Sequence, residues 1–265
     1  MSVYHLTHGQ FIFKNRRPDG DTLTFLPSKS LPVSLAYKQI RLENIDAPEL
    51  HFLGRSQPPI AAKSSLDALL SAIGAYPAKT MLGSHAWAST PAPVTGWVAY
   101  RSFDTFRRAI AYVFPTDVFP VNTKTMSPAE LPIERSANFQ MLADGKAFPM
   151  FFSTSDRDHR FKLTDAAQKA SIATKPFIRD DVSRQFQVSQ LADITEHQLI
   201  YPRLFRRLIS YAATHPNFDG FGAYLKAHDD YAATAQGRQS LSQMLEIEGN
   251  TFRFNNNLVS LVWET

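Results

Sequence analysis

The chain contains no cysteine among its 265 residues. This absence excludes disulfide frameworks, thiolate metal sites and cysteine nucleophiles, and leaves oxygen ligands, with histidine as a minor option, for metal chemistry. The sequence also lacks a Gly-x-Ser-x-Gly elbow and a glycine-rich loop followed by Lys and Ser or Thr. Those motifs mark serine hydrolases and nucleotide phosphate sites, so the sequence argues against both.

Long apolar runs are missing as well. No uninterrupted run approaches the roughly 20 residues that span a bilayer, whereas 44% of the residues are hydrophobic, as in globular proteins. We therefore expect a soluble protein without a membrane partner. Residues 1–8 lack the basic start and apolar core of a signal peptide, so we expect a cytoplasmic protein, or a secreted one whose leader has been removed.

Charge and length alone do not identify a function. The 28 Lys and Arg residues against 24 Asp and Glu give a net charge of +4, which mildly favours a polyanionic partner but is common in enzymes. The length suffices for one large domain, or for a core domain and a smaller appendage, without disulfides.

Apolar periodicity and turn residues predict an α+β fold with five strands and a helix inserted between the third and the fourth. The strands are expected within residues 3–14, 22–25, 37–45, 97–100 and 108–114, and the helices over 61–73, 133–144 and 163–174. Residues 83–96 are rich in Pro, Ser, Thr and Gly and are expected to form a loop. Beyond about residue 185 the pattern predicts helices over 197–215 and 219–230 and a hairpin over 244–254.

Three carboxylates gather around the second and third strands. Asp21 follows a tight turn, and Asp46 and Glu49 come shortly after Arg41. These acidic side chains would repel one another unless a cation or the arginine offset them, and oxygen ligands suit a hard ion such as Ca²⁺. Asp21 and Asp46 are the expected metal ligands, together with the backbone carbonyl of Ala47.

The same residues suit the hydrolysis of a phosphodiester bond. Hydrolysis needs an activated water, a cation, and donors for the charge that grows in the transition state. Glu49 is free to orient or deprotonate water. Arg41 and Arg108 suit the phosphate oxygens, because a guanidinium donates two parallel hydrogen bonds and stays charged. These residues predict a metal-dependent nuclease that uses Ca²⁺, with Mg²⁺ or Mn²⁺ as alternatives.

Several segments, in the same order along the chain, resemble the staphylococcal nuclease (thermonuclease) family. The matching segments are Asp19 to Thr22, Arg41 to Glu49 and Asp104 to Tyr112, with a weaker match at Asn138 to Ala147. Together they cover about residues 8–175, in the family's order. The resemblance implies a five-stranded OB-type β-barrel with packed helices.

The resemblance also implies the role of each site residue. Asp21 and Asp46 would bind Ca²⁺, Glu49 would act as the general base, and Arg41 and Arg108 would contact the scissile phosphate of DNA or RNA. All five positions hold the expected residue type.

The sequence departs from the family around the nucleotide. Thr105, Phe106 and Phe151 stand where the best-known member has a lysine and two tyrosines, which contact the terminal phosphate of a bound nucleotide. The preferred position of cleavage therefore does not follow from the resemblance.

On this basis residues 1–185 are expected to form the nuclease-like OB-fold domain, and residues 186–265 a mainly helical C-terminal extension packed on it. Two alternatives stay open. One is a catalytically inactive OB-fold module that binds nucleic acid, although the intact acidic residues argue against it. The other is an active nuclease whose C-terminal region recruits a protein partner. Arg203, Arg206 and Arg207 form the densest basic cluster, and a solvated helix face is slightly favoured over a nucleic-acid surface.

Overall fold

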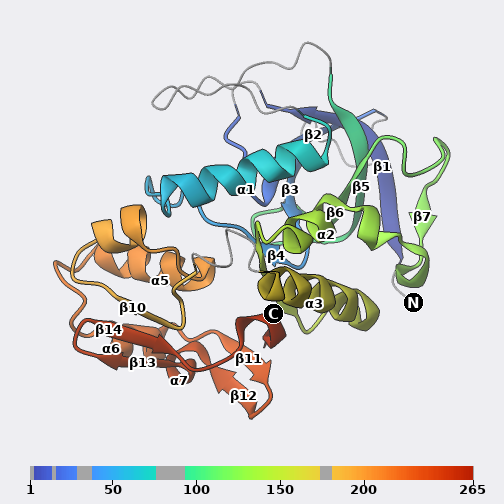
Figure 1. The fold of residues 1–265 in the computed structure, drawn as a ribbon. Coiled ribbons are helices and arrows are strands. Elements are labelled where there is room, and N and C mark those ends of the chain that lie inside the picture. The colour runs from blue at the N-terminus through green and yellow to red at the C-terminus, as the bar shows by residue number, and fades with distance from the viewer. Residues whose placement is uncertain (1–2, 14–15, 29–37, 76–92, 174–180, 265) are drawn as a thin grey trace.

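The computed structural model describes residues 3–13, 16–28, 38–75, 93–173 and 181–264. Figure 1 shows a strand-rich body formed by the first part of the sequence and, beside it, a group of helices and short strands formed by the last part. Most of the predicted loop over residues 83–96 lies outside the described residues. Among the described helices, none has both the length and the apolar content needed to cross a bilayer.

Five strands close into a barrel. They are β1 (Tyr4–Ile12), β2 (Thr22–Pro27), β3 (Lys38–Leu42), β5 (Thr95–Phe103) and β6 (Ala109–Pro115). The hydrogen-bonded order is β2-β3-β6-β5-β1, and β1 pairs again with β2, which closes the sheet on itself. Only β3 and β6 run parallel within the barrel. The predicted α+β class and five-stranded barrel are therefore confirmed, and the arrangement is compatible with an OB-type barrel.

Alternation along β3 decides which side chain faces the candidate site. Ile40 and Leu42 are buried in the barrel core, whereas Arg41 between them is only partly buried, because successive side chains of a strand point to opposite faces. The register places Arg41 opposite Thr22 on β2. Arg41 therefore lies beside Asp21, the residue that precedes β2.

Helices pack around the barrel. They are α1 (Pro59–Ala72), between β3 and β5 in the chain, the 3₁₀ turns η1 (Pro128–Glu130) and η2 (Ile133–Arg135), α2 (Ala137–Ala143) and α3 (Arg157–Ile172). Pro59 stands in the first turn of α1, and Gly74 follows its end with a φ of +77°, as these residue types favour. The third predicted helix begins at Arg157 rather than Leu163, because the Asp156 side chain accepts two backbone hydrogen bonds and caps it there.

A buried polar cluster lies beneath the barrel. The Tyr4 hydroxyl donates to Glu43, 3.2 Å from each carboxylate oxygen, and Arg101 Nη2 donates to Glu43 Oε1 at 3.0 Å. His159 of α3 stacks on the Tyr4 ring at 5.8 Å and meets the Tyr112 ring edge-on at 5.2 Å. These contacts fix α3 against the first strand.

We expect His159 to make the fold sensitive to acid. Burial lowers the pKa of His159 below its ordinary 6.5, although the carbonyl of Pro128 opposes the shift. The unfolded chain therefore takes up this proton more readily. The stability that neutral His159 contributes is full above about pH 6.5 and is lost as the pH falls through the lower pKa of the folded state.

The test compares the free energy of unfolding of the wild type and His159→Phe at pH 7.5 and pH 5, by urea denaturation. The wild type should lose about 1 kcal/mol more than the variant over this interval. Identical losses in the two proteins would show that His159 does not carry the effect.

Residues 181–264 combine helices and strands around a second hydrophobic core. The elements are β10 (Gln185–Gln187), the π-helical turn η3 (Asp193–His197), α5 (Pro202–Ala212), α6 (Phe221–Ala227), β11 (Tyr231–Thr234), β12 (Gly237–Ser240), α7 (Leu241–Met244), β13 (Leu245–Glu248), β14 (Thr251–Phe254), η4 (Leu258–Ser260) and β15 (Val262–Trp263). The predicted hairpin is β13–β14, and the two predicted helices are α5 and α6. The β11–β12 hairpin was not predicted, so the region is mixed rather than mainly helical.

Among the described residues, four further short strands occur, and one of them joins the two parts of the chain. They are β4 (Ile45–Asp46), β7 (Thr125–Met126), β8 (Phe148–Pro149) and β9 (Phe151–Phe152). β9 pairs in parallel with β15, and β8 pairs with β4 of the candidate site. Phe148 and Met150 already belong to the second core. The domain boundary at residue 185 stays a prediction, and these contacts cross it.

Candidate active site

The turn before β2 is pressed against the loop that follows β4. A Cβ atom on Gly20 would lie 2.3 Å from Ser65 Oγ of α1 and 2.7 Å from Ala47 Cβ, far closer than the 3.5 to 4.0 Å of ordinary contact. Only glycine permits this approach. It brings Asp21 next to Asp46, and both side chains are buried.

Arg41 joins the two aspartates. Its Nη1 donates to Asp21 Oδ1 at 2.5 Å, and its Nη2 donates to Asp46 Oδ1 at 2.6 Å. The Ala47 backbone N–H donates to the other oxygen of Asp21 at 2.9 Å. Four predicted site residues therefore meet in one cluster, although the role of the Ala47 carbonyl as a ligand stays a prediction.

A second arginine enters the site from α5. Arg206 Nη1 donates to Asp46 Oδ1 at 3.0 Å, its Nη2 donates to Asp46 Oδ2 at 2.9 Å, and its Nη1 also pairs with Glu49 Oε1. The side chain of Asp46 is 0% exposed, and that of Arg206 is 21% exposed. Asp46 is thus held between Arg41 and Arg206.

Four carboxyl groups form what we call the acidic cluster (Asp19, Asp21, Asp46 and Glu49), which the guanidinium groups of Arg41 and Arg206 contact. Burial and the like charge of its neighbours raise the pKa of Asp19 to about 8. Burial is also the main cause that raises the pKa of Glu49. Burial acts in the same direction on Asp46, but Arg206 and Arg41 outweigh it and hold the pKa of Asp46 below its ordinary value.

Arg108 lies on the neighbouring β5–β6 turn. Its Nε donates to Asp104 Oδ2 at 2.6 Å, and its guanidinium carbon lies 5.5 Å from the centre of the Phe106 ring. Among the described residues, the ion pair of Arg108 is with Asp104 and not with the acidic cluster. The structure therefore brings together five of the six predicted site residues and leaves Arg108 apart.

Gln57 holds the loop that carries Glu49, a role that the sequence did not predict. Its side chain accepts the Glu49 N–H at 3.1 Å and donates to the Ile200 carbonyl at 2.6 Å, and it is fully buried. Gln57 thus links the loop that carries Glu49 to the segment just before α5. A lone glutamine before two prolines gives no periodic signal that could have shown this role.

The contact of Arg206 with the site was also not predicted, although the sequence shows the basic cluster that contains it. The interpretation as a solvated helix face is wrong for all three arginines. Arg203 Nη2 lies 2.8 Å from Asp230 Oδ1, and Arg207 Nη2 lies 2.7 Å from Asp230 Oδ2. The density of arginine on one helix was the only available signal, and it did not indicate their acidic partners.

The donor atoms of the acidic cluster are of the kind that a hard divalent cation prefers. These side-chain donors are carboxylate oxygens, which Ca²⁺, Mg²⁺ and Mn²⁺ prefer, and two guanidinium groups already lie on these oxygens as stand-in cations. Asp21 and Asp46 are the residues that would hold the ion. In the part of the chain that the structure describes, no group of three or more acidic or histidine side chains is arranged so that it could hold a metal ion. A cation at Asp46 would share its oxygen atoms with the arginines.

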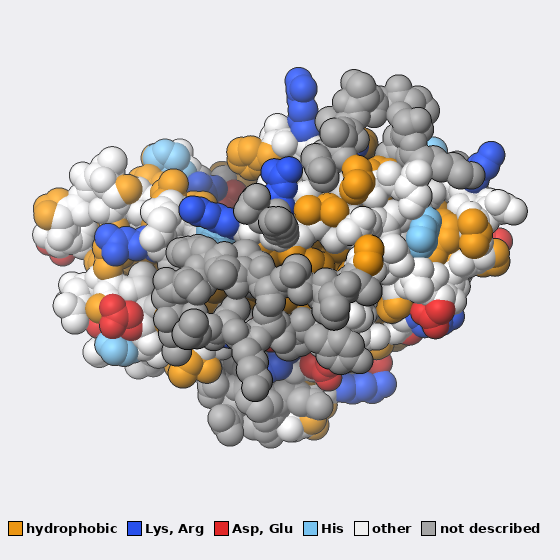
Figure 2. Space-filling view, turned by 90° about the horizontal axis from the view of Figure 1, so that it is seen from above, with side chains coloured by type: hydrophobic (Ala, Val, Ile, Leu, Met, Phe, Trp, Pro, Cys, Tyr) orange, Lys and Arg blue, Asp and Glu red, His pale blue; other side chains and the backbone are white. Residues whose placement is uncertain are grey.

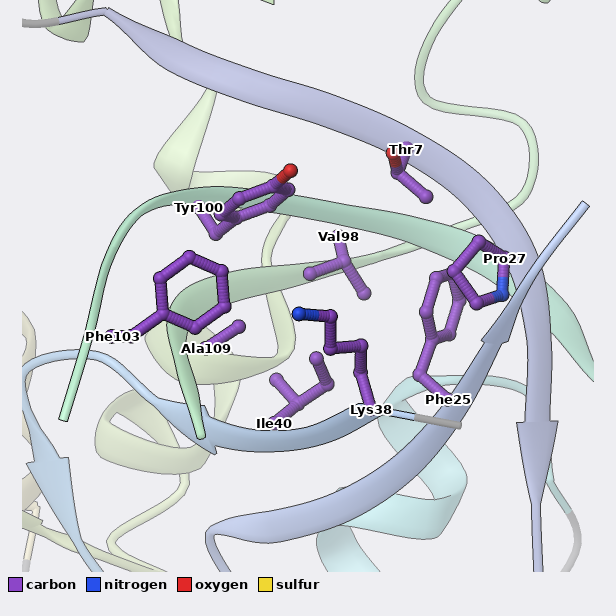
Figure 3. A pocket seen from close by; sticks show the side chains of 9 residues that line it. All are labelled: Thr7, Phe25, Pro27, Lys38, Ile40, Val98, Tyr100, Phe103 and Ala109. Carbon is purple, nitrogen blue, oxygen red and sulfur yellow. The ribbon is translucent and has the colours of Figure 1, made fainter. Parts of the chain in front are cut away.

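A separate crevice lies inside the barrel and shares no residue with the acidic cluster. Figure 3 shows Phe25, Tyr100 and Phe103 around it, with the amine of Lys38 pointing into it, 4.5 Å from the centre of the Phe103 ring. Its volume of about 10 Å³ is close to the space of a single water. Burial lowers the pKa of Lys38. The crevice is part of the barrel packing and is too small for a substrate.

Comparison with known proteins does not assign this chain to a family. No protein-family model matches this chain, and no curated protein matches it significantly. The resemblance to the staphylococcal nuclease family therefore rests on the motifs and stays a hypothesis, with which the barrel is compatible.

Proposed function

We propose that this chain is a Ca²⁺-dependent nuclease that hydrolyses phosphodiester bonds of DNA and, as a second substrate, RNA. The observation that supports the proposal is the convergence of Asp21, Arg41, Asp46 and Glu49 in one cluster. Burying charged groups costs several kcal/mol per ion unless they are well paired. Carboxylate oxygens that suit a divalent cation, with arginines beside them that suit a phosphate, are the groups that this reaction needs.

In the proposed reaction Glu49 is the general base. It takes a proton from a water molecule, whose oxygen bonds to phosphorus as the bond from phosphorus to the leaving oxygen breaks in line. Burial raises the pKa of Glu49, which makes its carboxylate a stronger base than that of a free glutamate. Arg41 donates hydrogen bonds to the phosphate oxygens as negative charge grows on them. When bound, a divalent cation supplies further neutralisation of that charge.

The direct test is cleavage by the full chain. Supercoiled plasmid, single-stranded DNA and RNA are each incubated with the protein and Ca²⁺, Mg²⁺ or Mn²⁺, and in parallel with a chelator. We expect cleavage of DNA with Ca²⁺ and none with the chelator. If no substrate is cut with any of the three cations, the nuclease proposal is refuted.

A non-catalytic OB-type module that binds nucleic acid is the second candidate. The engagement of both Asp46 oxygens by Arg41 and Arg206 favours it, because a carboxylate held in this way also serves as a structural anchor. On the face seen in Figure 2, the Lys and Arg side chains of the described residues are scattered rather than joined in one stripe, which gives little support for a long strand-binding groove. Such a module would retard strands in a gel without cutting them.

Arg108 is proposed as the second phosphate contact, and its replacement tests that role. We expect Arg108→Ala to lower kcat by on the order of 10² to 10³, because the variant lacks one donor for the transition-state charge. The matched control is Arg107→Lys, since Arg107 adjoins it in the same turn. A wild-type kcat for Arg108→Ala would mean that Arg108 serves only its ion pair with Asp104.

A further inference from the structure

Arg206 engages the two carboxylates on which the proposed chemistry depends. It donates to both oxygens of Asp46 and pairs with Glu49. Ca²⁺ sits about 2.3 to 2.6 Å from its carboxylate ligands, so a cation bound at Asp46 would lie beside a guanidinium of like charge on the same oxygens, and each would weaken the binding of the other. We infer that Arg206 competes with the divalent cation for Asp46 and Glu49, so that the C-terminal region sets the cation affinity of the site. This inference rests on the proposed cation site.

The fold of the C-terminal region holds Arg206 in place. On the same helix, Arg203 and Arg207 both pair with Asp230, and the Arg203 guanidinium lies 4.2 Å from the centre of the Trp263 ring. These contacts fix α5 against the second core. The guanidinium of Arg206 is therefore delivered to the acidic cluster by a rigid helix.

The barrel side of the contact is fixed as well. Gln57 bonds both to the Glu49 backbone and to the Ile200 carbonyl just before α5. The helix and the loop that carries Glu49 are thereby tied together. Release of Asp46 from Arg206 then requires only the side chain of Arg206 to turn away, and its 21% exposed surface gives it a path to solvent.

Electrostatic repulsion determines whether removing Arg206 strengthens or weakens cation binding. Without Arg206, the acidic cluster keeps its carboxylates but has only the Arg41 guanidinium to offset them. Repulsion between like charges a few ångströms apart in a partly buried site far exceeds the thermal energy. Removing this positive charge should therefore strengthen cation binding.

The experiment measures Ca²⁺ affinity by isothermal titration calorimetry on the full chain, with no nucleic acid present. The proteins are the wild type, Arg206→Gln, Arg206→Ala, and Arg253→Gln as the control, because Arg253 belongs to an exposed ion pair of the same region. We expect both Arg206 variants to bind Ca²⁺ about tenfold more tightly or better, and the control to bind like the wild type. Asp46→Asn should abolish the gain when combined with Arg206→Gln.

The outcomes separate this inference from the proposed function. If the wild type binds Ca²⁺ and neither Arg206 variant binds more tightly, the inference is overturned and the nuclease proposal stands. If neither the wild type nor any variant binds Ca²⁺, Mg²⁺ or Mn²⁺, the proposed cation site and the inference are both refuted. Circular dichroism in chelator checks that each variant is folded. If Arg206→Ala is not folded, the affinity of Arg206→Gln alone tests the inference, because this change removes the charge and keeps a polar side chain that can donate a hydrogen bond.

Discussion

Replacing Glu49 by glutamine lowers kcat for single-stranded DNA by roughly 10² to 10⁴, while the protein stays folded. The amide keeps the size of the side chain, and its oxygen still accepts a hydrogen bond from Arg206. It cannot take a proton from water, so only the proposed base function is lost. Initial rates on an oligonucleotide with a fluorophore and a quencher, at saturating Ca²⁺, measure the effect.

The pH profile gives this prediction a second readout. Because burial raises the pKa of Glu49 above 4.5, the wild-type rate should fall as the pH drops through that raised value, where the base becomes protonated. Glu49→Gln should lack this limb. Glu248→Gln, in an exposed ion pair with Arg253, is the matched control and should keep both rate and profile. A wild-type rate for Glu49→Gln would end the assignment of Glu49 as the base.

Replacing Asp46 by alanine destabilises the fold by about 3 to 5 kcal/mol. Asp46 is fully buried and accepts hydrogen bonds from Arg41 at 2.6 Å and from Arg206 at 2.9 and 3.0 Å. Without it, Arg41 keeps only Asp21 and Arg206 keeps only Glu49 as a paired carboxylate of the cluster. Urea denaturation in chelator measures the loss without any contribution from bound metal.

An exposed ion pair provides the control for this loss. Asp117 lies 3.3 Å from Arg135, and its side chain is 73% exposed, so Asp117→Ala should cost about 1 kcal/mol or less. The pH dependence distinguishes the two sites further. The folded pKa of Asp46 is depressed, so its contribution is full above the unfolded value near 3.8 and is lost as the pH falls through the lower folded value. Equal stabilities of Asp46→Ala and the wild type at neutral pH would contradict the prediction.

Sequence patterns predicted the parts of the fold that depend on near neighbours. Alternating apolar residues located the barrel strands, and proline and glycine located both ends of α1, because strands, turns and caps are set within a few residues. The β11–β12 hairpin was missed, since its short strands are mostly exposed and carry no clear alternation. The start of α3 was missed because the capping side chain of Asp156 precedes any helical periodicity.

The same distinction holds within the candidate site. Arg41, Asp46 and Glu49 lie on one strand and the loop after it, so the sequence by itself determined that they share a neighbourhood, and the adjoining turn added Asp21. Only the tertiary structure decided that Arg206, 160 residues after Asp46, offsets their charge. Pairing of distant charges depends on how two cores pack against each other, and no local pattern of residues encodes that packing.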